Sequence, residues 1–216
     1  SSSDSCQIGG NLATNAGGIK AVRYGVTRNQ VYAVQIVTPY GDIVDLGSPL
    51  KKCSTGYCME QLVIGSEGTL GIITQVTLKL QLLPPYKIDM LAIFHDQMAA
   101  IGVVPQLVKA GIDPTSIEYM DNPNVRTTSE YLEFPGAPHI EDGIYVIITI
   151  ETFNEDELDM KMEQASDICE AAGAVDVLEA DERIWSMRRN CLESVSLISK
   201  VCTTDDVVVP VDEMSD

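Results

Sequence analysis

Two glycine-rich segments contain the residue types with which a backbone can bind an anion or lie against a flat ring. The first is IGGNLATNAGG, from Ile8 to Gly18, and RYG follows it at Arg23–Gly25. Because its side chains are small, successive N–H groups can form a nest for an anion or approach a planar ligand closely. A tight structural loop is the alternative that glycine content alone leaves open.

The second segment, GSEGTLGIIT from Gly65 to Thr74, leads directly into a predicted strand. Its glycine spacing matches neither the dinucleotide fingerprint G-x-G-x-x-G nor the P-loop G-x-x-x-x-G-K-[ST], so the motifs for nicotinamide binding and ATP hydrolysis are missing. Glu67 lies between glycines, where its charge would oppose that of a phosphate. A structural role, in which Glu67 accepts hydrogen bonds from backbone N–H groups, is equally open.

A basic pair after the chain's single tryptophan is the third chemical feature, in the run Trp185-Ser186-Met187-Arg188-Arg189. A guanidinium is planar and binds a carboxylate through two parallel hydrogen bonds. From the sequence alone, a solvated pair that offsets the nearby acids is the favoured interpretation; those acids are Asp181, Glu182 and Glu193.

The cysteines and histidines give no recognisable metal or disulfide motif. Six cysteines stand at positions 6, 53, 58, 169, 191 and 202 without a C-x-x-C pair, so we expect reduced and mostly structural thiols. His95 and His139 are each alone in the sequence. We therefore predict no metal site from this chain.

The elements that must position these residues divide at Pro84-Pro85. Before the prolines, residues 31–37 and 42–46 predict a hairpin, and residues 73–80 predict a half-buried strand with Val76, Leu78 and Leu80 on one face. After them, strands are predicted at 88–94, 116–120, 144–151 and 174–178, with helices ending near Lys109, at about 155–172 and from about 181. Residues 121–142 are read as a polar excursion. The order β-α-β-β-α-β predicts a split βαβ sandwich, one sheet with helices on one face.

Composition limits the function classes. The 216 residues carry a net charge of −18, and a surface so negative disfavours nucleic-acid and membrane-surface binding. No apolar run is long enough to span a bilayer, so we expect a soluble, cytoplasmic protein, with peripheral membrane association through a partner left open. The chain begins without Met and ends after an apolar run, and we expect a fragment.

Together the runs IGGNLATNAGG…RYG and TGYCMEQLVIGSEGTLGIIT resemble flavoproteins of the vanillyl-alcohol-oxidase type. The closer similarity is to the 2-hydroxy-acid dehydrogenases among them: the glycolate oxidase flavoprotein subunit, D-lactate dehydrogenase and D-2-hydroxyglutarate dehydrogenase. The resemblance covers nearly the whole chain and implies an α+β fold. Residues 1–85 would be the C-terminal part of an FAD-binding domain, and residues 86–216 a ferredoxin-like cap or substrate domain that lacks its C-terminal end.

The resemblance implies FAD as cofactor, held by the two glycine-rich segments. The implied contacts are Gly9, Gly10, Asn11, Thr14, Asn15, Gly17, Gly18, Glu67, Gly68, Gly71 and Ile72. Arg188 matches the family's clamp for the substrate carboxylate. The family's first glycine loop and its metal-binding H-x-G-D-G-N-x-H segment are missing, so a divalent metal is expected only in the full-length enzyme. No catalytic base is identified, and the fragment is expected to be inactive alone.

The function implied by the resemblance is oxidation of a small 2-hydroxy acid, such as glycolate or D-lactate, to the 2-oxo acid by hydride transfer to flavin. Two alternatives stay open. One is a non-catalytic scaffold or assembly module derived from a flavoprotein, and the other is a metal-free FAD oxidase of the same fold. The implied electron-accepting partners are an electron-transfer flavoprotein or an iron–sulfur subunit.

Overall fold

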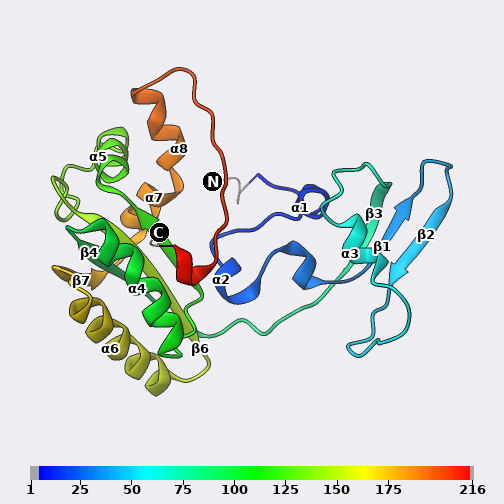
Figure 1. The fold of residues 1–216 in the computed structure, drawn as a ribbon, viewed down its shortest axis with the longest axis horizontal. Coiled ribbons are helices and arrows are strands. Elements are labelled where there is room, and N and C mark those ends of the chain that lie inside the picture. The colour runs from blue at the N-terminus through cyan, green and yellow to red at the C-terminus, as the bar shows by residue number, and fades with distance from the viewer. Residues whose placement is uncertain (1–4, 215–216) are drawn as a thin grey trace. The chain divides into compact units, whose positions relative to one another are not determined.

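The computed structural model describes residues 5–214, which divide between Leu83 and Pro84 into two compact units (Figure 1). We call residues 5–83 the N-terminal unit and residues 84–214 the C-terminal unit. The fold mixes helices and sheets, in agreement with the predicted α+β class.

The N-terminal unit is built on a three-stranded antiparallel sheet with strand order β2-β1-β3. The strands β1 (Val31–Val37) and β2 (Ile43–Gly47) form the predicted hairpin, and β3 (Ile72–Leu78) pairs with the other edge of β1. The short helices are α1 (Ile8–Thr14), α2 (Ala21–Tyr24), the 3₁₀ turn η1 (Thr27–Gln30) and α3 (Met59–Val63). Their core is small; its buried members are Leu12, Val31, Val34, Ile36, Val63 and Ile64.

The predicted burial pattern of β3 is wrong. Ile73 and Val76 pack against the core, whereas Leu78 and Leu80 are 37% and 90% exposed. The pairing of β3 with β1 shifts register between Gln35 and Ile36. Because such an irregularity breaks the two-residue period, residues three apart can face the same side of the sheet.

The C-terminal unit contains the four-stranded antiparallel sheet β5-β6-β4-β7. In chain order its elements are β4 (Tyr86–Phe94), α4 (Gln97–Lys109), β5 (Ser116–Met120), α5 (Asn122–Tyr131), β6 (Ile144–Thr152), α6 (Glu155–Ala171), β7 (Asp176–Glu179), α7 (Glu182–Arg189), α8 (Cys191–Ser194) and the 3₁₀ turns η2 (Val195–Leu197) and η3 (Val211–Glu213). The order of strands and the two crossover helices α4 and α6 confirm the predicted split βαβ arrangement.

Local sequence signals explain the longest helix, α6. The side chain of Asn154 accepts a hydrogen bond from the backbone N–H of Glu157, and three acidic residues occupy the first turn. Gly173 follows the helix with φ +100°, a left-handed conformation suited to a C-terminal stop. Cys169 lies fully buried on the inner face of α6, and burial raises the pKa of its thiol to about 12, with the Glu170 carboxylate adding to the shift.

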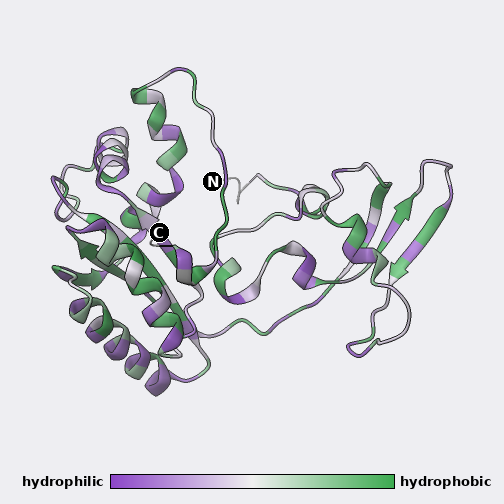
Figure 2. Cartoon of the chain, in the orientation of Figure 1, coloured by the Kyte–Doolittle hydropathy of each residue, from purple (hydrophilic) through white to green (hydrophobic). Residues whose placement is uncertain are grey.

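Both faces of this sheet are covered, which corrects the prediction of helices on one face only. Helices α4 and α6 pack on one face through a cluster that includes Val103, Leu107 and Ala165. On the other face, Val125 of α5 and Trp185 of α7 belong to a second buried cluster. All nine residues of β6 are therefore buried, and the strands appear as a hydrophobic layer in Figure 2.

Helix α5 lies within residues 121–142, where the sequence predicted no element. Most residues of α5 are polar (NPNVRTTSEY), so this segment shows only weakly the apolar periodicity that predicts a buried helix. The cap is nevertheless clear: the side chain of Asp121 accepts from the backbone N–H of Asn124, and Pro123 stands in the first turn. None of the helices in residues 5–214 has the length and apolarity needed to cross a membrane.

Candidate functional site

The first glycine-rich segment forms the short helix α1, whereas the sequence predicted a bare backbone. Leu12 anchors α1 in the core with 1% exposure, and Asn15 ends the helix in a left-handed conformation with φ +52°. Beyond the first turn of a helix the N–H groups are consumed by intrahelical hydrogen bonds. The N–H groups of Gly9 and Gly10 belong to the first turn of α1 and are not used by the helix, whereas those from Asn11 onward bond within it.

The structure brings the two glycine-rich segments together although about 50 residues separate them. The backbone N–H of Gly65 donates to the Leu12 carbonyl at 2.9 Å, and that of Glu67 donates to the Ala13 carbonyl at 2.9 Å. The loop after α3 therefore docks on the C-terminal end of α1. Each segment supports the conformation of the other, and we treat them as one surface, the glycine surface.

Arg28 joins the two halves of the glycine surface and was not singled out by sequence. Its guanidinium donates to the Ile64 carbonyl at 2.9 Å, and its backbone N–H donates to the side-chain oxygen of Asn15 at 3.0 Å. The bond to Ile64 links residues 36 positions apart, and no local sequence pattern predicts such a contact. Asn15 thus has a structural role as well as its predicted ligand role.

Several glycines of this surface have no neighbour that requires the absence of a side chain. A Cβ added at Gly9, Gly10 or Gly18 would meet no atom within 4 Å; the space beside Gly68 is also open, but its φ of +79° itself favours glycine. Gly9 and Gly10 lie in the first turn of α1, and each costs up to about 1 kcal/mol of helix stability relative to alanine. Packing within the described chain does not account for this cost, whereas a flat ligand on the surface would.

The other predicted flavin contacts have different surroundings. A Cβ at Gly71 would come within 2.8 Å of the Val37 carbonyl, so the chain itself requires glycine there. Gly17 would make only an ordinary contact with Val26 at 3.4 Å. The hydroxyl of Thr14 donates back to the carbonyl of Gly10.

Three predicted contacts keep their side chains at or near the surface. Asn11 is half-buried, and its amide donates toward the Cys6 sulfur at 3.7 Å. Glu67 is exposed in a left-handed conformation with φ +51°, and Ile72 is 69% exposed at the start of β3.

Arg188 lies on α7 in the C-terminal unit and forms an ion pair with Glu118 of β5. Its Nε and Nη2 atoms each lie 2.6 Å from Oε2 of Glu118. The Glu118 side chain is only 11% exposed, compared with 36% for Arg188. Burial raises the pKa of Glu118 above its usual value, while the positive charge and hydrogen bond of Arg188 pull that pKa down.

This pairing orients the guanidinium and leaves part of it available. A guanidinium has five N–H donors, of which two serve Glu118, and the Arg188 side chain also interacts with the thiol of Cys191. Trp185 anchors α7 to the sheet, because its side chain belongs to the buried cluster that also contains Val125 of α5. The neighbouring Arg189 instead pairs with Glu182, which is largely exposed. The two arginines therefore have different environments, which the sequence could not distinguish.

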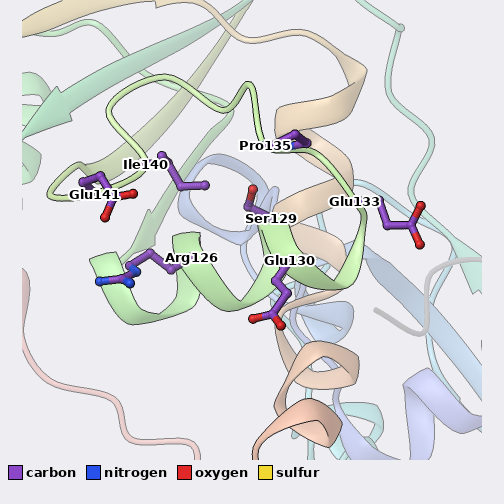
Figure 3. Close-up of a pocket in the computed structure, with 7 residues that line it drawn as sticks. All are labelled: Arg126, Ser129, Glu130, Glu133, Pro135, Ile140 and Glu141. Atoms are coloured by element: carbon purple, nitrogen blue, oxygen red, sulfur yellow. The ribbon is translucent and has the colours of Figure 1, made fainter.

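A cavity of about 330 Å³ in the C-terminal unit contains none of the predicted site residues (Figure 3). Helix α5 and the loop that follows it supply its lining, which is Arg126, Ser129, Glu130, Glu133, Pro135, Ile140 and Glu141. Three carboxylates against one guanidinium make this lining unsuited to a carboxylate ligand. We assign it no part in the site.

Two protein families match parts of this chain. The family described as "FAD linked oxidases, C-terminal domain" matches residues 83–216, and "FAD binding domain" matches residues 1–47. The first match covers more than half of the chain. The chain therefore belongs to the FAD-linked oxidases, as the sequence resemblance predicted, and FAD is the cofactor of this family.

Named relatives agree with this assignment. The chain is 38% identical to the D-lactate dehydrogenase of Anaerostipes hadrus over 97% of its own length and 46% of that protein. It is 33% identical to the glycolate oxidase subunit GlcD of Bacillus subtilis, covering 96% of the chain and 45% of GlcD. It is 30% identical to the D-2-hydroxyglutarate dehydrogenase of Stutzerimonas stutzeri, covering 90% and 43%. The chain spans about half the length of these relatives.

Solved structures support the same fold. An alkyldihydroxyacetonephosphate synthase matches with a TM-score of 0.67 at 22% identity, covering 88% of this chain and 36% of that protein. A p-cresol methylhydroxylase with bound substrate matches with a TM-score of 0.65 at 13% identity, covering 84% and 41%. At these identities the similarity concerns the fold alone.

Proposed function

We propose that this chain forms part of an FAD-dependent dehydrogenase that oxidises a small 2-hydroxy acid to the 2-oxo acid. The glycine surface of the N-terminal unit would lie along the flavin cofactor. Arg188 of the C-terminal unit would bind the substrate carboxylate. The oxidoreductases among the named relatives include two whose names specify D-lactate and D-2-hydroxyglutarate, which supports a 2-hydroxy acid as substrate.

The open space at Gly9, Gly10 and Gly18 is the observation that carries the proposal. Within residues 5–214 no neighbouring atom requires glycine at these positions, and glycine at two of them lowers the stability of the helix that contains them. A planar ring can approach a backbone closely only where no Cβ intervenes. The residues therefore fit a flavin, which supplies a hydride acceptor when bound.

In the proposed reaction, this chain binds and orients the substrate. Arg188 would hold the substrate carboxylate through the donors that Glu118 does not use, while Glu118 keeps the guanidinium in place. The substrate loses a hydride from its hydroxyl-bearing carbon and a proton from the hydroxyl. We assign no base to residues 5–214, and we derive no step through a metal because the family's histidine segment does not occur in this sequence.

Partners of the complete enzyme follow from the same proposal. GlcD is named as a subunit. We therefore propose that the enzyme that contains this chain has an electron-accepting partner, which is either an iron–sulfur subunit or an electron-transfer flavoprotein. The enzyme's specific acid and its acceptor depend on surfaces beyond the glycine surface and Arg188.

Substitution of Gly10 tests the proposal in the complete enzyme. Alanine and leucine are good helix formers, so Gly10→Ala and Gly10→Leu should leave thermal stability unchanged or raise it by up to about 1 kcal/mol. Flavin content, measured by absorbance after purification, should fall from glycine to alanine to leucine. The matched control makes the same substitutions at Gly102 in α4, where an added Cβ also meets no atom within 4 Å. Normal flavin content in Gly10→Leu would contradict the proposal.

A further inference from the structure

The only two histidines of the sequence come together with a carboxylate at one end of the C-terminal sheet. His95 and His139 are 44 positions apart, yet their rings lie 5.8 Å apart between centroids. One ligand atom from each of His95, His139 and Asp142 lies within 4.8 Å of the other two. Nε2 of His95 and Oδ1 of Asp142 are 3.4 Å apart.

These distances suit a shared metal ion. Two ligands bound at roughly 2.1 Å to one tetrahedral ion lie about 3.4 Å from each other. Imidazole with carboxylate is a donor set typical of Zn²⁺ and similar divalent transition metals. Asp176 adds a second carboxylate, with Oδ2 at 3.7 Å from Nε2 of His139. All four side chains are 36% exposed or more, so an ion can reach them.

The backbone that supports the cluster is well fixed. His95 directly follows β4, and Asp142 comes two residues before β6, at a point where Phe94 pairs with Ile144. Asp176 begins β7 and pairs with Ile93. The three positions thus lie at neighbouring strand ends of one sheet.

The loop that carries His139 is tied to the same strand end. The backbone N–H groups of Asp142 and Gly143 both donate to the His139 carbonyl. The amide of Asn122 donates to the carbonyls of Ile140 and Gly143, each at 3.1 Å. The ligands are therefore brought together before any ion binds, which lowers the entropy cost of binding.

We propose that His95, His139 and Asp142 form a binding site for a divalent transition metal of the Zn²⁺ type, with Asp176 completing or supporting the coordination. Bound there, the ion would link the end of β4, the loop before β6 and the start of β7. The proposal does not depend on the proposed flavin function, because it uses neither Arg188 nor any residue of the glycine surface.

Imidazole NMR on the full 216-residue chain tests the proposal with Zn²⁺ as the probe. With only two histidines, each ring gives an assignable signal, and zinc bound to cysteines elsewhere would not be mistaken for this site. The titration is run at about pH 7.5, because metal ions compete with protons for ligand nitrogens and bind more tightly as the pH rises. We expect both ring signals to shift together along one binding curve that saturates at one equivalent.

Variants complete the test. His95→Ala and His139→Ala should each abolish the shift of the remaining histidine, and Asp142→Asn should weaken binding about tenfold or more. Glu141→Gln is the matched control, because it removes an exposed carboxylate next to Asp142 that is not part of the cluster. The proposal is overturned if excess Zn²⁺ leaves both rings unshifted, if the rings titrate with separate midpoints, or if Glu141→Gln weakens binding as much as Asp142→Asn.

Discussion

The two units of this chain differ in how much of their structure they supply for themselves. In the N-terminal unit a single cluster of six buried residues supports a three-stranded sheet. In the C-terminal unit, clusters of thirteen and eleven buried residues cover both faces of a four-stranded sheet. Burial of apolar area is the main stabilising contribution to folding, so the C-terminal unit is the better candidate for an independent fold.

The two units also differ in net charge. Residues 1–83 contain six basic and five acidic side chains, whereas residues 84–216 contain eight basic and 27 acidic ones. Both units expose large apolar side chains, among them Leu80 (90% exposed) in the N-terminal unit and Val208 (95%) in the C-terminal unit. A near-neutral unit with exposed apolar surface is suited to contact with further protein or ligand. The acidic unit has an electrostatic field that favours cations over anions.

The strongest test of this comparison is separation of the units. We expect residues 84–216 to survive limited proteolysis as a folded piece and to unfold cooperatively when expressed alone. Residues 1–83 should be degraded, because their sheet has two open edges and a small core. Mass spectrometry of the surviving fragment identifies the outcome. A stable N-terminal fragment with a labile C-terminal half would reverse the comparison.

A core substitution measures the same difference within the intact chain. Ile148 of β6 is fully buried between two layers, and we expect Ile148→Ala to lower the free energy of unfolding of the C-terminal unit by about 2–5 kcal/mol. Denaturant unfolding followed by Trp185 fluorescence reports this unit, because the chain has one tryptophan. Val34→Ala in the N-terminal unit is the control and should leave the tryptophan transition in place.

Arg188 tests whether the acidic unit contributes a local positive centre for an anionic substrate. In the complete enzyme, Arg188→Ala should lower kcat/KM. The fall should correspond to a loss of about 2–4 kcal/mol of transition-state stabilisation, the cost of losing a charged hydrogen-bonding partner. Arg188→Lys should restore only part of this loss, because lysine lacks the planar fork. Flavin content should stay normal in both variants. Steady-state kinetics with each variant measures the effect.

Two controls separate substrate binding from structure at Arg188. Arg189→Ala removes the neighbouring guanidinium, which pairs with the exposed Glu182, and should have little effect. Glu118→Gln removes the charge that orients Arg188 and should raise KM while the arginine remains. If Arg189→Ala is the damaging change and Arg188→Ala is mild, the carboxylate clamp has been assigned to the wrong arginine.

The smallest expected effect concerns the cap of α7, the helix that carries Arg188. The Asp181 carboxylate accepts from the backbone N–H groups of Arg183 and Ile184, so Asp181→Ala should cost about 1 kcal/mol of stability. The hydrogen bond from the Arg183 side chain, together with these backbone bonds, lowers the pKa of Asp181. The stabilisation is therefore present above the ordinary carboxyl pKa of about 4 and is lost as the pH falls below it.

Thermal unfolding between pH 3 and 7 checks this prediction. The difference between wild type and Asp181→Ala should shrink toward the acid end. Asp181→Asn keeps a capping oxygen and should recover most of the stability at neutral pH. An unchanged difference at all pH values would show that the carboxylate charge does not contribute.

The sequence by itself determined the family, the strands and the helices α4, α6 and α7. The two glycine-rich segments were sufficient to indicate an FAD-linked oxidase, and strands such as β6 and helix α6 follow from runs of apolar residues, caps and stop signals that act over a few residues. Residues 121–142 were missed because α5 is polar on average and becomes a helix through its cap and its packing on the sheet.

Only the tertiary structure decided which distant residues meet. Three contacts join positions more than 40 residues apart. They are the docking of Gly65 on Leu12, the ion pair of Arg188 with Glu118 and the cluster of His95 with His139. Such contacts depend on strand pairing and on helix packing across a sheet, which no short pattern of residue types encodes. The open space beside Gly10 is likewise a property of the folded surface, because the sequence shows where glycines occur and the fold shows which of them have no neighbour.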